Sequence, residues 1–292
     1  MLKVVLPKGS LERATLALFD DADLGVQRAS DVDYRGTIDD PRVESVRILR
    51  PQEIPRYVAS GLFDIGITGR DWIEETGADV VSLGELHYSK ATARPIKVVL
   101  AVGADSEASS VDDLPSGLCV HTEYPQLTTR YFDEHGIDAD VQLSYGATEA
   151  KVPDIADAVV EITETGRALR AAGLKIIETI LVSHTELIAN PAAHDDPEQR
   201  AAMEELQVLL TGALEARGRV LLKLNIDHDN LDAVIGLLPA LKAPTVSKLF
   251  GDAEDYAVET VVAKSEINIL IPALRAQGAT GIIELPISKI VP

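Results

Sequence analysis

One stretch of the sequence combines residue types that suit the binding of a phosphate group. The run from Asp157 to Leu169 reads DAVVEITETGRAL, so an apolar segment carrying Glu161 leads into a Thr-Glu-Thr-Gly turn and then into a helical pattern. The free backbone N–H groups and the dipole at a helix start favour an anion above Thr165 and Gly166. Glycine lets the backbone approach such a ligand closely. The stretch therefore predicts a phosphate-binding loop.

The side chains of the same loop indicate a sugar beside the phosphate. Thr163 and Thr165 carry hydroxyl donors, whereas Glu161 would repel a phosphate and suits ribose hydroxyls or a magnesium ion. Phosphate and sugar together suggest a phosphoribosyl group. A plainer alternative stays open, in which Thr163 and Glu164 only cap the helix that follows.

The remaining sequence shows no usual signature of metal or nucleophilic catalysis. It contains no His-Glu metal helix and no Ser-His-Asp set in a supporting context, and its six histidines are scattered. The single cysteine, Cys119, allows neither an intrachain disulfide nor a thiolate zinc cluster, and it fits a reducing compartment. We therefore expect no dedicated metal site, and we expect magnesium to arrive with a substrate.

Alternating strand and helix patterns place the loop in an α/β fold. The apolar run 2–6 is followed by a Pro-Lys-Gly-Ser turn and a helical pattern, and FDIGITGRDWIEE (63–75) repeats this order, with Asp71 positioned to cap its helix. This order predicts a parallel sheet. A second set of strands and helices begins at 96–102 and runs through β-branched segments to Asn190, so the middle of the chain forms its own lobe.

The C-terminal part follows a different order. Apolar positions recur at helical spacing from Pro197 to Arg217, and Gly218 ends that helix. The segments that follow read β-α-β-β-α-β, which is the ferredoxin-like pattern. We place a domain boundary near Gly218.

Composition sets the class of protein. A chain of 292 residues with 46% hydrophobic residues can fill two or three cores, and a net charge of −20 opposes binding to nucleic acid or to anionic lipid. The sequence has no apolar h-region of a secretory signal and no apolar run of about 18 residues that would span a membrane. We expect a soluble, cytoplasmic protein with no nucleic-acid and no membrane partner.

Several segments resemble, in the same order, those of the ATP phosphoribosyltransferase family. The loop from Glu161 to Ala168 with the AAGL that follows resembles that family's phosphoribosyl-pyrophosphate loop, although many members carry a threonine where this chain has Ala168. Similar segments are LPKGSL (6–11), ASGLFDIGITGRDWIEE (59–75) and TEYPQLTTRYFDEHGI (122–137). Two further runs, at 231–252 and 278–291, are similar to the regulatory domain of the family's long form. The resemblance covers essentially the whole chain.

The resemblance implies a fold and a site. It implies the two-lobed, periplasmic-binding-protein-like core of a type IV phosphoribosyltransferase, followed by a ferredoxin-like (ACT-like) regulatory domain. Lobe I would comprise 1–95 and 183–215, lobe II 96–182, and the regulatory domain 218–292, with the active site between the lobes. The candidate catalytic residues are Lys8, Lys97 and Glu161. The candidate substrate-binding residues are Gly9, Ser10, Thr68, Gly69, Arg70, Thr122, Tyr124, Pro125, Asp157, Thr163, Glu164, Thr165, Gly166, Arg167 and Ala168.

The resemblance also implies a reaction and its regulation. N1 of ATP would displace pyrophosphate from the anomeric carbon of phosphoribosyl pyrophosphate, with Mg²⁺ as cofactor, in the first step of histidine biosynthesis. The protein would hold two polyanions in line and neutralise pyrophosphate, without a nucleophilic side chain. Histidine would inhibit by binding to the C-terminal domains, which pair through their sheets, and dimers would assemble into a hexamer. The candidate histidine-binding residues are Asn225, Leu241, Thr245, Val261 and Gly281.

Two other functions fit a two-lobed α/β chain. A solute-binding protein closes around a ligand without chemistry, but the missing export signal and the phosphate loop argue against this class. An amino-acid sensor would use the lobes as a passive scaffold, and it would bind histidine without releasing pyrophosphate.

The acidic composition leads to a prediction about salt. Surfaces this acidic resemble those of proteins from a high-salt cytoplasm, where ions screen the repulsion among carboxylates. We expect the thermal unfolding midpoint to rise steeply between low and molar salt, as measured by circular dichroism. A midpoint that stays constant over this range would contradict the hypothesis.

Overall fold

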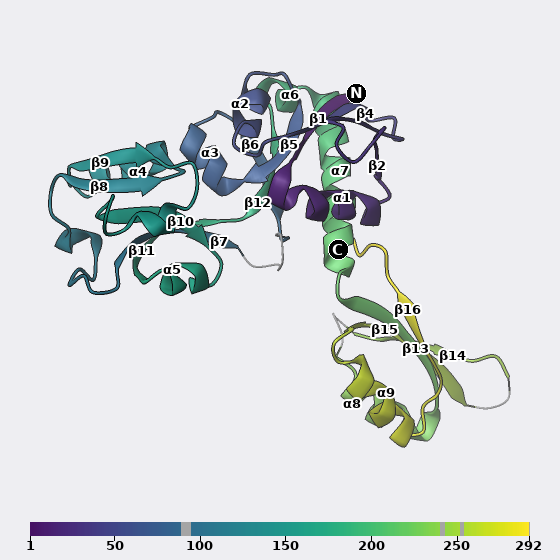
Figure 1. Cartoon of the computed structure of the whole chain (residues 1–292). Helices are drawn as coiled ribbons and strands as arrows, with labels where there is room; N and C mark the ends of the chain where they lie inside the picture. The colour runs from purple at the N-terminus through teal and green to yellow at the C-terminus, as the bar shows by residue number, and fades with distance from the viewer. Residues whose placement is uncertain (89–94, 240–242, 252–253, 292) are drawn as a thin grey trace. The chain divides into compact units, whose positions relative to one another are not determined.

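The computed structural model describes residues 1–88, 95–239, 243–251 and 254–291, and it divides into two compact units, Met1–Gln207 and Val208–Pro292 (Figure 1). The N-terminal unit contains two mixed sheets, and the C-terminal unit contains one antiparallel sheet. None of the helices within these ranges is long and apolar enough to cross a membrane.

The first sheet is parallel at its centre and antiparallel on both sides. Its strands, in spatial order, are β2 (Val26–Gln27), β3 (Arg35–Ile38), β4 (Val43–Leu49), β1 (Leu2–Pro7), β5 (Ile65–Gly69), β12 (Thr185–Ala189) and β6 (Val81–Leu86). Strand β1 pairs in parallel with β4 and β5, whereas β12 is antiparallel to β5 and β6. The predicted parallel pairing is confirmed for β4, β1 and β5, but the sheet as a whole is mixed, because β3 and β12 join it in the antiparallel direction.

Helices pack closely on the first sheet. They are α1 (Glu12–Asp21), α2 (Ile54–Ala59) and α3 (Arg70–Thr76), whereas α6 (Pro191–Asp195) follows β12 in the chain. Val5 of β1 belongs to a buried cluster with Ile54 and Val58 of α2. Gly66 permits this approach, since a Cβ atom there would lie 2.8 Å from Val5 Cγ1 and 2.9 Å from Val58 Cγ2. The small residue in β5 therefore sets how closely α2 packs on the sheet.

The centre of the second sheet is buried on both faces. Its strands, in spatial order, are β11 (Leu174–Ser183), β7 (Ile96–Gly103), β10 (Ala158–Thr163), β8 (Leu118–Thr122) and β9 (Ala139–Leu143). Alternate residues of β7 enter two different cores, because side chains along a strand point to opposite faces. Val98 and Leu100 share one core with Phe132 of α4 (Pro125–Glu134), and Val99 shares the other with Leu169 of α5 (Arg167–Ala171).

The chain passes directly from the second sheet to the first between β11 and β12. Ser183 ends β11 and Thr185 begins β12, so His184 is the only residue between the two strands. The sequence pattern predicts buried strands over this stretch. The structure confirms both strands, but only β12 is buried along its whole length, and the two strands belong to different sheets. Residues near this crossover are therefore held by both sheets at once.

The C-terminal unit has the predicted β-α-β-β-α-β order. Its elements are β13 (Arg219–Asp227), α8 (Leu231–Leu237), β14 (Thr245–Lys248), β15 (Asp255–Ala263), α9 (Ile267–Ala276) and β16 (Thr280–Pro286). The spatial order β14-β15-β13-β16 is antiparallel throughout. Leu222 and Leu224 of β13 pack with Val234 of α8 and Leu274 of α9, so both helices cover one face of the sheet. Helix α7 (Pro197–Ala216) begins in the N-terminal unit and continues into the C-terminal unit, and it ends before Gly218, whose φ is +71°.

Candidate functional site

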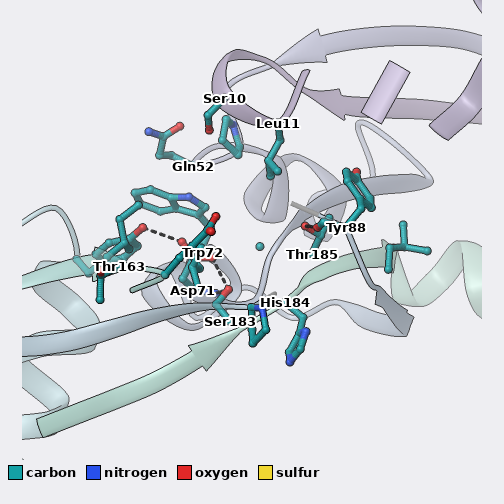
Figure 2. A pocket seen from close by; sticks show the side chains of 18 of the residues that line it. Ser10, Leu11, Gln52, Asp71, Trp72, Tyr88, Thr163, Ser183, His184 and Thr185 are labelled. Atoms are coloured by element: carbon teal, nitrogen blue, oxygen red, sulfur yellow. Dashed lines mark hydrogen bonds between the residues drawn. The ribbon is translucent and has the colours of Figure 1, made fainter. Parts of the chain in front are cut away.

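A cavity of about 380 Å³ opens in the N-terminal unit, and segments from both of its sheets line it (Figure 2). This volume falls within the range of small-molecule sites, about 300 to 1,000 Å³. Five of the residues predicted from the sequence line this cavity. They are Ser10, Gly69, Tyr124, Thr163 and Glu164.

One buried carboxyl group joins the segments around the cavity. Asp71 is 2% exposed, and its two oxygens accept hydrogen bonds from Ser183 Oγ at 2.6 Å and from the Tyr124 hydroxyl at 2.7 Å. The backbone N–H of Asp71 also donates to Ser183 Oγ at 3.0 Å. Figure 2 shows Asp71 and Ser183 together beside the cavity. Asp71 therefore ties α3 to the segment before α4 and to the crossover.

Burial changes the proton affinity of this network. Desolvation raises the pKa of the Asp71 carboxyl above its ordinary value of 3.8, and the hydrogen bonds from Ser183 and Tyr124 oppose that rise. Desolvation, followed by the charge of Asp71, raises the pKa of the Tyr124 phenol well above its ordinary value of 10. The phenol therefore keeps its proton at neutral pH and remains a hydrogen-bond donor.

The sequence analysis predicts Asp71 as a helix cap, and this prediction is wrong. The N-cap position of α3 is held by Gly69, without a side-chain cap. A capping contact exists elsewhere, because the carboxylate of Glu75 on α3 accepts the backbone N–H groups of Gln126 at 3.1 Å and Leu127 at 2.9 Å. These are free N–H groups in the first turn of α4, so a carboxylate from one helix stabilises the start of another.

Two aromatic rings form an apolar wall. The rings of Trp72 and Tyr124 lie 4.5 Å apart between centroids, with an interplanar angle of 33°, and both residues line the cavity. Trp72 follows Asp71 on α3, whereas Tyr124 immediately precedes α4. The Asp71–Tyr124 hydrogen bond thus also fixes how the two rings meet.

The predicted phosphate loop forms a tight turn between β10 and α5. Thr163 Oγ1 accepts the backbone N–H of Gly166 at 2.7 Å, and Gly166 adopts a left-handed conformation with φ +70°. Arg170 Nη2 donates to the carbonyl of Thr165 at 2.8 Å. Thr163 therefore stabilises the turn before α5, in agreement with the alternative in which it only caps the helix. Its hydroxyl hydrogen is not used in that bond and can still be donated to a ligand.

The other predicted residues lie in or beside the cavity-lining segments but do not line the cavity. Thr68, Arg70 and Thr122 lie on β5, α3 and β8, and Pro125 is in the first turn of α4 as predicted. Lys97 on β7 lies opposite Thr163 in the antiparallel ladder. The remainder are Lys8, Gly9, Asp157, Glu161, Thr165, Gly166, Arg167 and Ala168.

Several of these residues have structural partners. Lys8 Nζ lies 3.9 Å from Glu12 Oε2 and 4.3 Å from the centre of the Tyr34 ring. Thr68 Oγ1 donates to the carbonyl of Pro51 at 3.0 Å. Asp157, at the opposite end of β10 from the loop, accepts the backbone N–H of Cys119 at 2.8 Å.

The predicted histidine-binding residues gather on one sheet of the C-terminal unit. By the strand register, Asn225, Thr245 and Val261 all lie on the face opposite to α8 and α9. Gly281 is adjacent to Asn225, since a Cβ atom there would lie 3.2 Å from Asn225 Nδ2. Leu241 lies outside the described residues.

The sequence analysis missed several cavity residues. Trp72 follows directly after the predicted Arg70 and Asp71, so its inclusion would have needed only a longer motif. Ser183, His184 and Thr185 lie in one β-rich run without a turn signal, and nothing in that run shows that the chain changes sheets there.

Comparison with known proteins identifies relatives over the whole chain. A family model described as ATP phosphoribosyltransferase matches residues 50–212, and one described as HisG, C-terminal domain, matches residues 216–289. The ATP phosphoribosyltransferase of Solibacter usitatus is 48% identical over 291 residues, covering 100% of this chain and 99% of that protein. That of Desulforudis audaxviator is 47% identical over 293 residues, with coverage of 100% and 99%.

A solved structure shows the same fold. The ATP phosphoribosyl transferase (HisG:HisZ) complex from Thermotoga maritima matches with a TM-score of 0.61 at 24% identity, covering 72% of this chain and 99% of that chain.

The raised pKa of Asp71 leads to a prediction about pH. Between the ordinary value near 3.8 and the raised value, the folded protein keeps a proton that the unfolded chain has lost, so the stability from this group decreases as pH rises through that window. Asp71→Asn cannot titrate. The free energy of unfolding of the wild type minus that of Asp71→Asn should therefore decrease as pH rises above about 4.

Urea unfolding at fixed molar salt measures this difference, with fluorescence of Trp72, the single tryptophan, as the signal. A difference that stays constant or increases with pH would show that folding does not raise the pKa of Asp71.

Proposed function

The chain belongs to the ATP phosphoribosyltransferase family in its long form, which acts in histidine biosynthesis, and we propose that the cavity beside Asp71 is where ATP and phosphoribosyl pyrophosphate react. One observation carries this proposal. Residues of four separate family-like segments, represented by Ser10, Gly69, Tyr124 and Thr163, line the same cavity. These segments lie far apart in the sequence, and the fold brings them together around one cavity, as expected for an active site.

The β10–α5 loop is proposed to bind the 5′-phosphate of phosphoribosyl pyrophosphate. Thr163 accepts the Gly166 N–H and keeps its hydroxyl hydrogen as a donor to a phosphate oxygen. Thr165, Arg167 and Ala168 belong to the same turn and helix start, where backbone N–H groups suit an anion. Ala168 has no hydroxyl, so the backbone would make this contact without help from that side chain.

The aromatic wall is proposed to bind adenine. A purine ring stacks well on tryptophan, and Trp72, whose ring packs on the buried ring of Tyr124, lines the cavity. Gly69, beside Trp72, adds no side chain that would narrow the cavity. Stacking here would direct N1 of the adenine toward a ribose held by the β10–α5 loop.

Magnesium fits the carboxylates near that loop. Desolvation, followed by the charge of Glu123 and later that of Glu149, raises the pKa of the Glu161 carboxyl, so these groups destabilise one another as anions. A cation relieves such repulsion, and Mg²⁺ prefers oxygen ligands of this kind. Glu161 and Glu123 would hold Mg²⁺ together with substrate oxygens, and the ion would neutralise charge on pyrophosphate.

The reaction requires that the negative charge of pyrophosphate be neutralised and that the two substrates be aligned. A bond forms between N1 of adenine and the anomeric carbon while the bond from that carbon to pyrophosphate breaks. Lys8 and Lys97 are proposed to bind phosphate oxygens that extend beyond the cavity, since they adjoin the lining segments of Ser10 and Thr163. Holding the two substrates, both polyanions, in line would accelerate the reaction without a nucleophilic side chain.

The C-terminal unit is the regulatory domain of the long form, and we propose histidine as its ligand. Asn225, Thr245 and Val261 share the sheet face that carries no helix. Ile283 and Leu285 of β16 are 51% and 39% exposed, and they pair with Lys223 and Leu221 on the same face. An exposed apolar sheet face supports pairing of these domains in a homo-oligomer, with histidine bound between copies.

The proposal includes two lobes, a hexamer built from dimers and a cytoplasmic location. The lobes would divide as 1–95 with 183–215 and 96–182, followed by the regulatory domain at 218–292. ATP and a reducing compartment for Cys119 both favour the cytoplasm.

Pyrophosphate release tests the activity directly. The purified full chain in high salt should release pyrophosphate only when ATP, phosphoribosyl pyrophosphate and Mg²⁺ are all present, and histidine should lower the rate. A coupled assay with pyrophosphatase measures it. A chelator of Mg²⁺ should abolish the release, which in that control is measured without the coupling enzyme, because pyrophosphatase itself needs the ion. Folded protein that binds histidine but releases no pyrophosphate would instead be an amino-acid sensor.

Two glycines on either side of α5 test the phosphate loop. Gly166 and Gly173 both have left-handed backbones, at φ +70° and +78°, so alanine strains each by about 1–2 kcal/mol. A Cβ atom at Gly166 would meet Arg170 Nη1 at 2.7 Å, whereas one at Gly173 meets nothing within 4 Å. Gly166→Ala should raise the KM for phosphoribosyl pyrophosphate about tenfold, a loss of about 1.4 kcal/mol.

Gly173→Ala is the matched control and should leave that KM within about twofold. Equal effects of the two substitutions on KM would attribute the change to backbone strain in α5 rather than to a phosphate contact.

A further inference from the structure

The pairing of β12 with β6 brings three metal-binding side chains onto one face. In this antiparallel ladder Glu186 lies opposite Glu85, and Thr185 lies opposite Leu86. One step further, His184 comes opposite His87. Opposite residues point to the same face and alternate residues along a strand do so too, so Glu85, His87 and His184 share a face.

The distances among these side chains suit a common ion. Glu85 Oε2 lies 3.7 Å from His184 Nδ1 and 3.9 Å from His87 Nδ1, and one donor atom from each of the three residues lies within 4.8 Å of the others. Two ligands of one tetrahedral Zn²⁺, each bound at about 2.0–2.2 Å, lie about 3.4 Å apart. Small rotations of exposed side chains close this gap, and the side chain of His87 is 64% exposed.

Hydrogen bonds hold the backbone that carries these side chains. Thr185 Oγ1 donates to the carbonyl of Tyr88 at 3.0 Å, which joins the residue after His184 to the residue after His87. The backbone N–H of Arg70 donates to the carbonyl of His184 at 2.9 Å. The two histidines therefore keep their relative positions without an ion.

Nearby charges also favour a cation. Glu186 is buried on the same face, opposite Glu85, and its Oε1 lies 3.7 Å from Arg70 Nη1. Arg70 Nη2 also pairs with Glu74 at 2.6 Å. Glu74 is in turn paired with Arg130 at 3.7 Å, so its charge is already balanced. Glu85 and Glu186 together outweigh the single Arg70 guanidinium beside the two histidines, so a divalent cation meets an excess of negative charge.

We propose that Glu85, His87 and His184 bind a divalent transition-metal ion of the Zn²⁺, Co²⁺ or Ni²⁺ type at the wall of the cavity. Imidazole nitrogens suit these ions, whereas Mg²⁺ prefers oxygen ligands alone. The site is thus chemically distinct from the magnesium site proposed at Glu161. Three protein ligands leave a coordination position for water or another ligand. His87 and His184 both line the cavity, so a molecule bound there can reach the ion.

Metal titration of the full chain tests the proposal. Protein without a histidine tag, stripped of metal, is titrated with Co²⁺ and followed by its visible absorption, and with Zn²⁺ by calorimetry. We expect one equivalent bound per chain. His184→Ala and His87→Ala should each weaken binding at least about tenfold, because losing even a partner of a ligand costs about 10- to 100-fold in affinity.

His135→Ala is the control. The ring of His135 is also exposed, but it lies at the C-terminal end of α4, where its Nδ1 is hydrogen-bonded to the carbonyl of Tyr131 at 2.8 Å. This variant should bind both ions like the wild type. Circular dichroism of each variant verifies its fold. The side chain of His87 is more exposed than that of His184, so His87→Ala disturbs the packing less. Absence of stoichiometric binding by the wild type would overturn the proposal, as would equal weakening by His135→Ala or wild-type affinity in both His87→Ala and His184→Ala.

Discussion

The cavity of the N-terminal unit depends on a carboxyl group that is removed from water and held by two hydroxyl groups. Asp71 accepts from Tyr124, which precedes α4 beside the second sheet, and from Ser183, which ends β11. Without those two donors the buried group would keep only backbone N–H partners, and each side-chain hydrogen bond lost at a buried group costs about 1–3 kcal/mol. The same contacts fix the angle between the Trp72 and Tyr124 rings and bring the crossover against α3. One hydrogen-bonded group therefore determines both how the sheets meet and what shape of ligand the cavity accepts.

In the β10–α5 loop, the hydrogen bond that stabilises the turn leaves Thr163 free to serve the phosphate binding proposed for it. A threonine hydroxyl has one hydrogen and two lone pairs, so Thr163 can accept from Gly166 and still donate. Capping of the turn and binding of a phosphate are thus compatible uses of the same side chain. The adjacent carboxylates, Glu161 and Glu123, act in the opposite sense, because their mutual repulsion makes the site poor for an anion unless a cation comes with it.

Local patterns were sufficient for most elements and for the loop. A run rich in β-branched residues predicted β10, an apolar run in the C-terminal β-α-β-β-α-β order predicted β13, and Pro125 marked the start of α4, because these signals depend only on neighbours in the chain. Contacts between distant segments were not predictable in this way. Glu75 reaches N–H groups of α4, and His87 meets His184, only because strand register and crossover geometry place them together. Histidines that look scattered in the sequence become neighbours when β12 pairs with β6.

The place of β12 has a consequence for synthesis on the ribosome. This strand lies between β5 and β6 in the first sheet, yet it comes after all five strands of the second sheet. While the chain is being made, β5 and β6 have no partner between them until residue 189 has left the exit tunnel. The nascent first sheet must then wait with unpaired strand edges, which are prone to wrong pairing and aggregation. The second sheet, whose strands are contiguous in the chain, can form first and deliver the missing strand.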